Sequence, residues 1–365
     1  GPLLDQILAK APDVARDLDR RLVWTTLRQE VEAADVRDNR RITLAEMGFG
    51  GSDSDYLSKT AIEILLKRNE PDRARTLLRF IDDPQIVEGM LMQRRFAPLW
   101  DVLAAQAGPG LVHSRESSVR VAEQELADQP DNPEELADLV SAYTGAGRFA
   151  DAAALRARLP ASAEELAKID EQTAWAVNNV GLAMNKAGQS DAADKLFATL
   201  NGALPANGWR VSMMINRIEL LVFGGRFSDA LPLIDAAEKE PQSEFARQLL
   251  RRLRYCSLAR LDRKAEAGAL RPAVMTHAKD APVPTVDGLL CAGEPDEAER
   301  LILANVGNSE FDEDFVAAMQ SVPLISEDSS IWGRWNVLRS RPAIAAAFNR
   351  LGRDLPPALR VPLKD

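Results

Sequence analysis

The sequence is poor in the residues that build a disulfide scaffold or a zinc module. Its 365 residues include two cysteines, Cys256 and Cys291, and two histidines, and it has no CxxC motif. A Cys/His zinc site takes about four such ligands, and a disulfide scaffold takes a dense set of cysteines. We therefore expect no metal and no other cofactor. The two cysteines are expected to be buried thiols, with a Cys256–Cys291 bridge as the alternative.

A long apolar run and an excess of positive charge are also missing. The apolar segment 218–223 is short and is interrupted by Glu219, whereas a membrane-spanning helix takes roughly 20 apolar residues. The formal net charge is -10, and nucleic-acid affinity comes largely from Lys and Arg. The sequence thus predicts a chain that neither spans a membrane nor binds nucleic acid.

Motifs of established catalytic centres are absent as well. The two histidines, His113 and His277, lie far apart and outside any HExxH or HxH spacing. The loop GFGGSDSD at 48–55 is rich in glycine, but the Lys-Ser/Thr of a phosphate-binding loop does not follow it. We interpret it as an interhelical connection and predict a protein that is not an enzyme. The alternative is a helical enzyme with active residues around Asp53, Asp55 and the C-terminal tryptophans.

The chain nevertheless has enough apolar residues to fold. Apolar residues make up 46% and charged residues 27% of the sequence, a composition typical of globular proteins. At this length the chain is either two domains or an elongated array whose units pack only on their neighbours. Because no useful length of strand-like alternation occurs, we predict an all-α fold.

A helix-pair pattern occupies the centre of the sequence. Residues 174–205 show a large residue, an apolar residue, Gly and a large residue at set spacing, then Ala-x3-Phe, then Pro. These positions are Val177, Val180, Gly181, Met184, Ala193, Phe197 and Pro205. The segment resembles the tetratricopeptide-repeat family, in which small residues lie where the two helices of a pair cross. Gly188 is expected to end the first helix of this pair.

The resemblance continues on both sides of this unit. Upstream, the matching positions are Leu136, Leu139, Tyr143, Gly147 and Ala152. Downstream, they are Met214, Ile218, Leu221, Gly225, Ala230 and Ile234, with Arg217 where an apolar residue is usual. The turn glycines are 41 and 37 residues apart, which is longer than the family's period of about 34.

Weaker signals extend the array outward. The phrases RNEPDRARTLL at 68–78 and AGEPDEAERLI at 292–302 both place Glu-Pro-Asp at a helix start. They indicate further units near 55–84 and 279–306, with a degenerate unit at about 245–275. The resemblance thus implies a right-handed α-solenoid of six or seven antiparallel helix pairs. The predicted divisions are an N-terminal helical cap (1–50), degenerate repeats (51–108), a repeat array (109–310) and a C-terminal helical cap (311–365).

The resemblance also implies a function, because such an array curves around a concave groove that binds a protein or peptide. Two units supply the expected lining residues: Trp175, Asn178, Leu182 and Asn185, then Ser212, Ile215, Glu219 and Val222. Asn179 and Asn216 occupy equivalent positions, where family members use Asn to bond the ligand backbone; family habit alone is the competing explanation. The Lys and Asn of a chaperone-tail clamp are missing from the corresponding positions.

An arginine stripe is the other candidate binding feature. Arg247, Arg251 and Arg254 fall on one helical face, with Arg252 beside them. Guanidinium groups could bind an acidic peptide or an anionic polysaccharide. The simpler interpretation is a solvated face paired with nearby acids such as Glu240 and Glu244.

We therefore predict a non-catalytic scaffold that binds a protein or peptide of unknown identity. The Ala- and Arg-rich composition favours a bacterial source. The opening Gly1-Pro2 is typical of a cleaved expression tag, so a native signal peptide is expected to be absent from this sequence. The compartment, cytoplasmic or periplasmic, and the oligomeric state stay open. The alternative function is a periplasmic or outer-membrane-associated module in envelope assembly or polysaccharide export.

Overall fold

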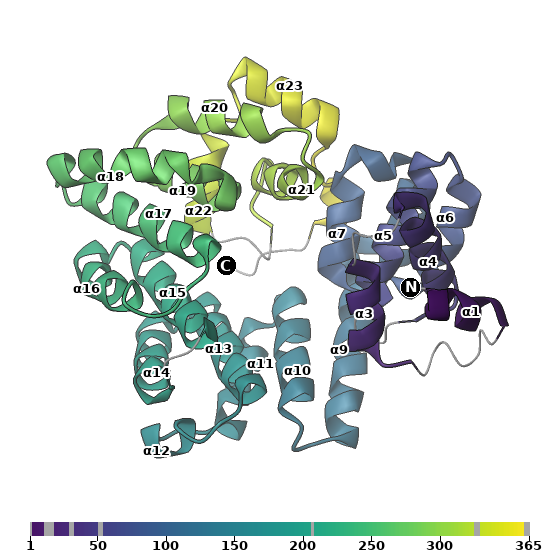
Figure 1. The fold of residues 1–365 in the computed structure, drawn as a ribbon, viewed down its shortest axis with the longest axis horizontal. Coiled ribbons are helices and arrows are strands. Elements are labelled where there is room, and N and C mark those ends of the chain that lie inside the picture. Colours follow the sequence, from purple (N-terminus) through teal and green to yellow (C-terminus); the bar gives the residue numbers. More distant parts are fainter. Residues whose placement is uncertain are drawn as a thin grey trace. The chain divides into compact units, whose positions relative to one another are not determined.

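The computed structural model describes residues 2–10, 18–28, 33–49, 54–205, 208–324 and 329–360. Over these residues the chain forms α-helices and short 3-10 turns and no β-strand, so the all-α prediction is confirmed (Figure 1). The chain divides into two compact units, one of residues up to 118 together with 354–360 and one of residues 119–353. The predicted boundaries at 50, 108 and 310 are finer than this division and stay predictions.

The first unit consists of short helices. They are α1 (Pro2–Lys10), α3 (Arg20–Arg28), α4 (Ala34–Glu46), α5 (Ser54–Lys67), α6 (Pro71–Leu77), α7 (Pro84–Met92) and α8 (Trp100–Ala107). Helix α9 (Val112–Asp128) runs across the division between the two units. Of the predicted glycine-rich loop, residues 50–53, including Asp53, lie outside the described residues, and α5 begins directly after them.

The second unit contains the centre of the predicted repeat array. Its helices are α10 (Pro133–Gly145), α11 (Phe149–Ala154), α12 (Ala163–Leu166), α13 (Glu171–Lys186), α14 (Ser190–Ala203), α15 (Gly208–Phe223), α16 (Phe227–Ala237), α17 (Glu244–Arg260), α18 (Lys264–Thr276), α19 (Pro282–Cys291), α20 (Pro295–Asn305), α21 (Ser309–Ala318), α22 (Ser329–Asn336) and α23 (Pro342–Leu351).

Helices α10 to α20 pack as pairs in chain order (Figure 1). We call α10, α13, α15, α17 and α19 the first helices, and α11, α14, α16, α18 and α20 the second helices. Each first helix packs on the second helix that follows it, and it also packs on the next first helix along the chain. The first helices therefore form one continuous row.

One turn recurs between the helices of a pair. In each turn one residue has a positive φ, and the next residue donates its backbone N–H to the carbonyl five residues earlier, at 2.8–2.9 Å. The positive-φ residues are Asn69, Gly147, Gly188, Gly225, Asp262 and Gly293. This bond satisfies a carbonyl that the helix end would leave unpaired. The turn joins α5 to α6 as well as the five pairs of the second unit.

A buried alanine accompanies every one of these turns. It lies five residues after the positive-φ residue, and in each case its exposed fraction is 6% or less. These residues are Ala74, Ala152, Ala193, Ala230, Ala267 and Ala298. A methyl group allows two helices to approach closely. In the degenerate unit near 245–275, Asp262 takes the left-handed position in place of Gly, and Asp and Asn tolerate this conformation better than most residues.

Gly181 and Phe197 show how close this approach is in the central pair. A Cβ atom added to Gly181 of α13 would lie 2.8 Å from the Phe197 ring of α14. Phe197 is fully buried. Arg217, which departs from the expected pattern, donates from α15 to Asp194 of α14 at 2.7 Å. An ion pair with α14 thus takes the place of an apolar contact at that position.

The expectation of two free thiols is wrong, because Cys256 and Cys291 form a disulfide. The bond joins α17 to α19, and their Cα atoms are 5.3 Å apart. The close approach of the two helices depends on Gly288, where a Cβ atom would lie 2.9 Å from the Cβ of Arg252. Thirty-five positions of sequence separate the cysteines, and only the packing of these helices brings them together.

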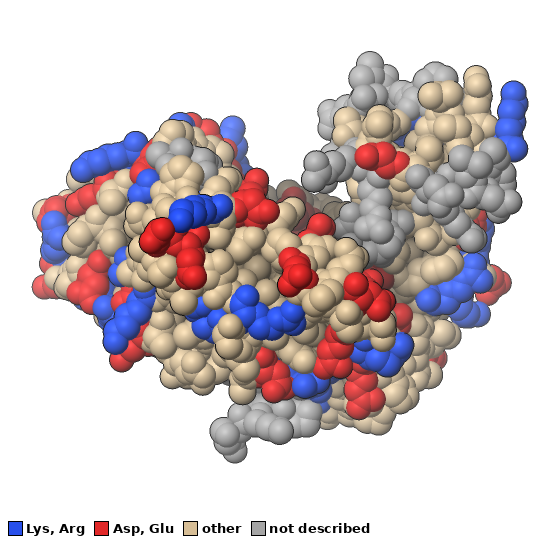
Figure 2. All heavy atoms as spheres, turned by 90° about the horizontal axis from the view of Figure 1, so that it is seen from below, with Lys and Arg blue, Asp and Glu red and all other residues tan. Residues whose placement is uncertain are grey.

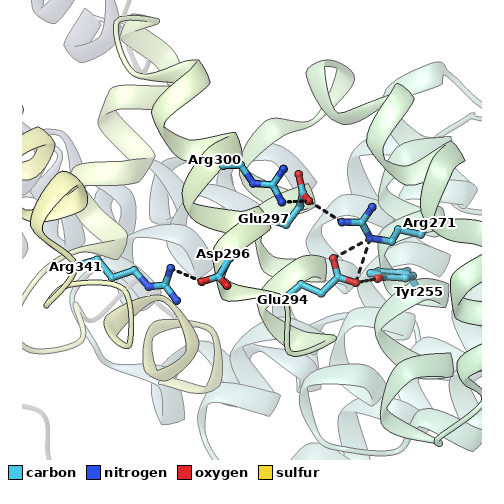
Figure 3. Close-up of polar contacts among 7 residues, drawn as sticks. All are labelled: Tyr255, Arg271, Glu294, Asp296, Glu297, Arg300 and Arg341. Carbon is cyan, nitrogen blue, oxygen red and sulfur yellow. Dashed lines mark hydrogen bonds and ion pairs between the residues drawn. The ribbon is translucent and has the colours of Figure 1, made fainter.

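Acidic residues in and just after the Glu-Pro-Asp sequence, at the start of α20, form hydrogen bonds and ion pairs with neighbouring helices (Figure 3). Glu294 accepts hydrogen bonds from Tyr255 of α17 and from Arg271 of α18, and Glu297 accepts from Arg271 at 2.7 Å. On the C-terminal side, Arg341 donates to Asp296 at 2.7 Å and to Glu299 at 2.6 Å. The first turn of α20 therefore connects the preceding pair to the residue before α23.

Replacing Gly181 by Ala should destabilise the fold by about 1–3 kcal/mol, because the new methyl group overpacks against Phe197. Gly202 of α14 is the matched control, since it is helical and nothing lies within 4 Å of its added Cβ. Gly202→Ala should stabilise by up to about 1 kcal/mol through helix propensity. Urea unfolding of both variants measures the difference, and equal effects would contradict the close crossing.

Candidate functional site

A chain of three asparagine side chains links the first helices α13 and α15. The amide of Asn178 donates to Asn179 Oδ1 at 3.2 Å, and Asn216 Nδ2 donates to Asn178 Oδ1 at 2.9 Å. Asn178 is 1% exposed, while Asn179 and Asn216 are half-buried. Asn178 therefore acts between the helices, and the two neighbouring asparagines are the ones that reach the surface.

Charged side chains continue this polar line along α15, α17 and α19. Arg252 of α17 pairs with Glu219 of α15, and its Nη1 lies 3.8 Å from Asp287 Oδ2 of α19. Asp287 in turn accepts a hydrogen bond from the indole N–H of Trp335 in α22. Arg252 is 4% and Asp287 7% exposed. Burial raises the pKa of Asp287, and the nearby Arg252 opposes that rise.

The other predicted lining residues differ in burial, and two of them have local partners. The Trp175 indole donates to Glu171 within α13 at 3.4 Å, and Asn185 accepts from Ser190 Oγ at 2.7 Å. Ser212 is half-buried. Leu182 is 37% exposed. The two remaining positions, Ile215 and Val222, are buried and belong to the core.

The arginine stripe on α17 is neutralised by carboxylates. Glu244 pairs with Arg247 and lies 4.0 Å from Arg251, while Arg254 reaches Asp235 at 2.6 Å and Glu238 at 3.0 Å. Figure 2 shows one face of the molecule, on which acidic and basic groups lie side by side. An anionic ligand on the stripe would have to displace these carboxylates.

Glu240, the other acid expected to pair with the stripe, instead pairs with Arg210 at 3.1 Å. Two adjoining pockets of about 410 and 510 Å³ lie beside α16 and the turn between α17 and α18, and they share three lining residues, Leu231, Asp235 and Arg263. Asp235 already pairs with Arg254, and Arg263 pairs with Glu266 at 2.6 Å. The charged groups of these pockets are thus satisfied within the protein.

His277, Asp280 and Glu244 bring three possible metal ligands within 4.8 Å of one another. The Nδ1 atom of the His277 ring forms a hydrogen bond with Asp280 Oδ2 at 2.9 Å. Glu244 is the acid that pairs with Arg247 and Arg251. Those two guanidiniums oppose a bound cation, so the arrangement fits local ion pairing better than metal binding.

Of the residues named for the alternative catalytic site, Trp335 is the buried donor to Asp287, and Asp55 holds a loop together. Its Oδ2 accepts the backbone N–H of Asp82 at 3.0 Å and of Asp83 at 2.5 Å, at the start of α7. Burial raises the pKa of Asp55 to about 6, against the lowering effect of these two bonds. Its environment is that of a carboxylate used for structure.

Among the described helices, none is both long enough and apolar enough to cross a bilayer. Scans of the sequence against protein-family models and against curated proteins find no match. The resemblance to tetratricopeptide repeats therefore depends on the residues and turns of this chain alone.

Asp55 should make stability depend on pH. Its folded pKa of about 6 exceeds the ordinary value of 3.8, so its contribution is fully present below pH 3.8 and is lost as the pH rises through about 6. Asp55→Asn keeps an oxygen acceptor for both amides and should flatten this decline. Thermal melts across that window test it, with exposed Asp101→Asn as the control. An unchanged profile in the Asp55 variant would refute the assignment.

Proposed function

We propose that this chain is a non-catalytic scaffold that binds a segment of a partner protein along its row of first helices. The observation that supports it best is the pair of surface asparagines held by a buried third one. Asn179 Nδ2 and Asn216 Oδ1 have no partner among the residues that the structure describes. One group can donate and the other can accept, which is what the backbone of a bound peptide requires.

The fold that we propose for this scaffold is a right-handed superhelix similar to tetratricopeptide repeats. Three features support it: the repeated turn with its left-handed residue, the buried alanine that follows each turn, and the contact of every first helix with the next. In such an array the first helices line the concave side, so the asparagines would face the groove.

Helix α13 adds apolar surface around Asn179. Trp175 and Leu182 lie one turn before and one turn after it, on the same helical face. Trp175 is half-buried and Leu182 is 37% exposed. A partner segment could therefore bury side chains on either side of its bonds to the asparagines. Buried apolar contacts contribute most of the free energy of association, and the amides set the direction and register of the segment.

Replacing Asn179 and Asn216 together by Ala should weaken partner binding roughly tenfold or more, since two hydrogen bonds of about 1 kcal/mol each are lost. The partner is first identified among proteins that co-purify with the chain, and its affinity is then measured by titration calorimetry.

The matched control is Asn178→Ala, which removes both hydrogen bonds among the asparagines but leaves the two surface amides in place. It should lower the melting temperature at least as much as the double variant and affect affinity less. If the double variant binds with wild-type affinity, the asparagines do not contact the partner.

A second candidate function gains support from the disulfide. Structural disulfides persist in oxidising compartments such as the periplasm and are rare in the cytosol. The Cys256–Cys291 bond therefore favours the periplasmic or outer-membrane-associated scaffold over a cytoplasmic one. The mode of partner binding would be the same, and only the compartment and the class of partner would differ.

Removing the disulfide by replacing both cysteines with Ser should cost about 3–4 kcal/mol, the loop-closure value for a separation of 35 residues. Adding a reductant to the unaltered chain should produce the same loss in urea unfolding. Alkylation without reductant, followed by mass spectrometry, should find no free thiol in chain recovered from the periplasm. Two alkylated cysteines in that sample would exclude the bond.

A further inference from the structure

Helix α22 lies against the row of first helices. It packs on α19 and on α21. The Trp335 side chain is fully buried, and its indole N–H donates to Asp287 of α19. The guanidinium of Arg334 lies 5.7 Å from the centre of the Phe223 ring at the end of α15. Two neighbouring residues of α22 thus reach two different first helices.

The covered positions have open equivalents elsewhere in the row. Counting back six residues from the positive-φ residue of each turn gives Leu182 in α13, Glu219 in α15, Cys256 in α17 and Asp287 in α19. Leu182 is 37% exposed and the Glu219 side chain 25%, whereas Cys256 is 2% and Asp287 7% exposed. The same helical position is therefore more exposed at α13 and α15 than at α17 and α19.

Two different interactions cover this helical position in α17 and in α19. Cys256 is covered by its bond to Cys291 within the row. Asp287 is covered by α22, whose Trp335 supplies the hydrogen bond that a buried carboxylate needs. At this end of the row the first helices thus pack against a short helix that contributes a buried indole and a cation over an aromatic ring.

We propose that α22 is an internal ligand of the first-helix row, which occupies the α19 end and restricts a partner to the α13–α15 end. A helix of this length is only marginally stable by itself, so α22 stays folded because it packs on α19 and α21 and buries Trp335, which bonds to Asp287. A partner segment that extends from Asn216 past Glu219 reaches Phe223, where it meets Arg334. Such a partner competes with α22, an extension that rests on the proposed function.

The test uses Trp335→Ala in the full chain and a labelled synthetic peptide of residues 329–340, SSIWGRWNVLRS. In the variant, α22 should open, so hydrogen exchange over 329–336 should accelerate about 100-fold while α13 and α15 stay protected. The peptide should then bind the variant and show little binding to the unaltered chain, whose site is filled. Absence of peptide binding to a folded variant with an open α22 would overturn the proposal.

Two controls isolate the indole. A peptide with Trp335 replaced by Ala should fail to bind, and Val337→Ala in the chain, at a position 61% exposed, should leave exchange unchanged. If the Trp335 variant does not fold, excess peptide added to the unaltered chain should still displace α22 and accelerate its exchange. Exchange that is insensitive to the peptide would count against the proposal. These readouts need no partner protein, so they fail or succeed independently of the two surface asparagines.

Discussion

The architecture depends on a backbone constraint at the end of the first helix in each pair. One residue must adopt positive φ so that the next N–H can bond back across the helix end and the chain can reverse. Because the turn is tight, the second helix starts close to the first, and only a small residue fits five positions later. The buried alanines satisfy this requirement in all six pairs. The turn and the alanine are thus two consequences of one geometric condition.

That condition explains how much of the fold could be predicted. The sequence indicates the turns at Gly147, Gly188 and Gly225, because glycine has the least steric cost at positive φ. Asp262 and Asn69 adopt the same backbone conformation although they carry side chains. The turns at these positions therefore have the same geometry but lack the glycine that would indicate them in the sequence. The helical class and the central units were accessible because local spacing encodes them. The disulfide was not, because Cys256 and Cys291 are brought together only by the packing of α17 on α19.

Which of the candidate residues reach the surface could be predicted only in part, for the same reason. Register within a helix identified Asn179 and Asn216, and it also included Asn178, which is buried once α15 packs on α13. The arginine stripe is visible as a pattern, but two of its carboxylate partners, Asp235 and Glu238, lie at the end of α16 in the preceding pair. The sequence pattern places Arg252 only beside the stripe, whereas in the structure its side chain connects α17 to Glu219 of α15 and to Asp287 of α19. Contacts between elements decide these roles, and spacing along one helix does not contain them.

The polar line along the first helices divides the row into two parts with different physical properties. Buried charges are costly unless they are paired, so Arg252 between Glu219 and Asp287 limits α15, α17 and α19 to one arrangement. The disulfide adds a covalent constraint to the same helices. The asparagines of α13 and α15, in contrast, are neutral amides with unused hydrogen-bonding capacity, and desolvating a neutral amide costs far less than desolvating a charge. Breaking polar contacts therefore costs least at the asparagines, next to a part of the row that the ion pairs and the disulfide hold in place.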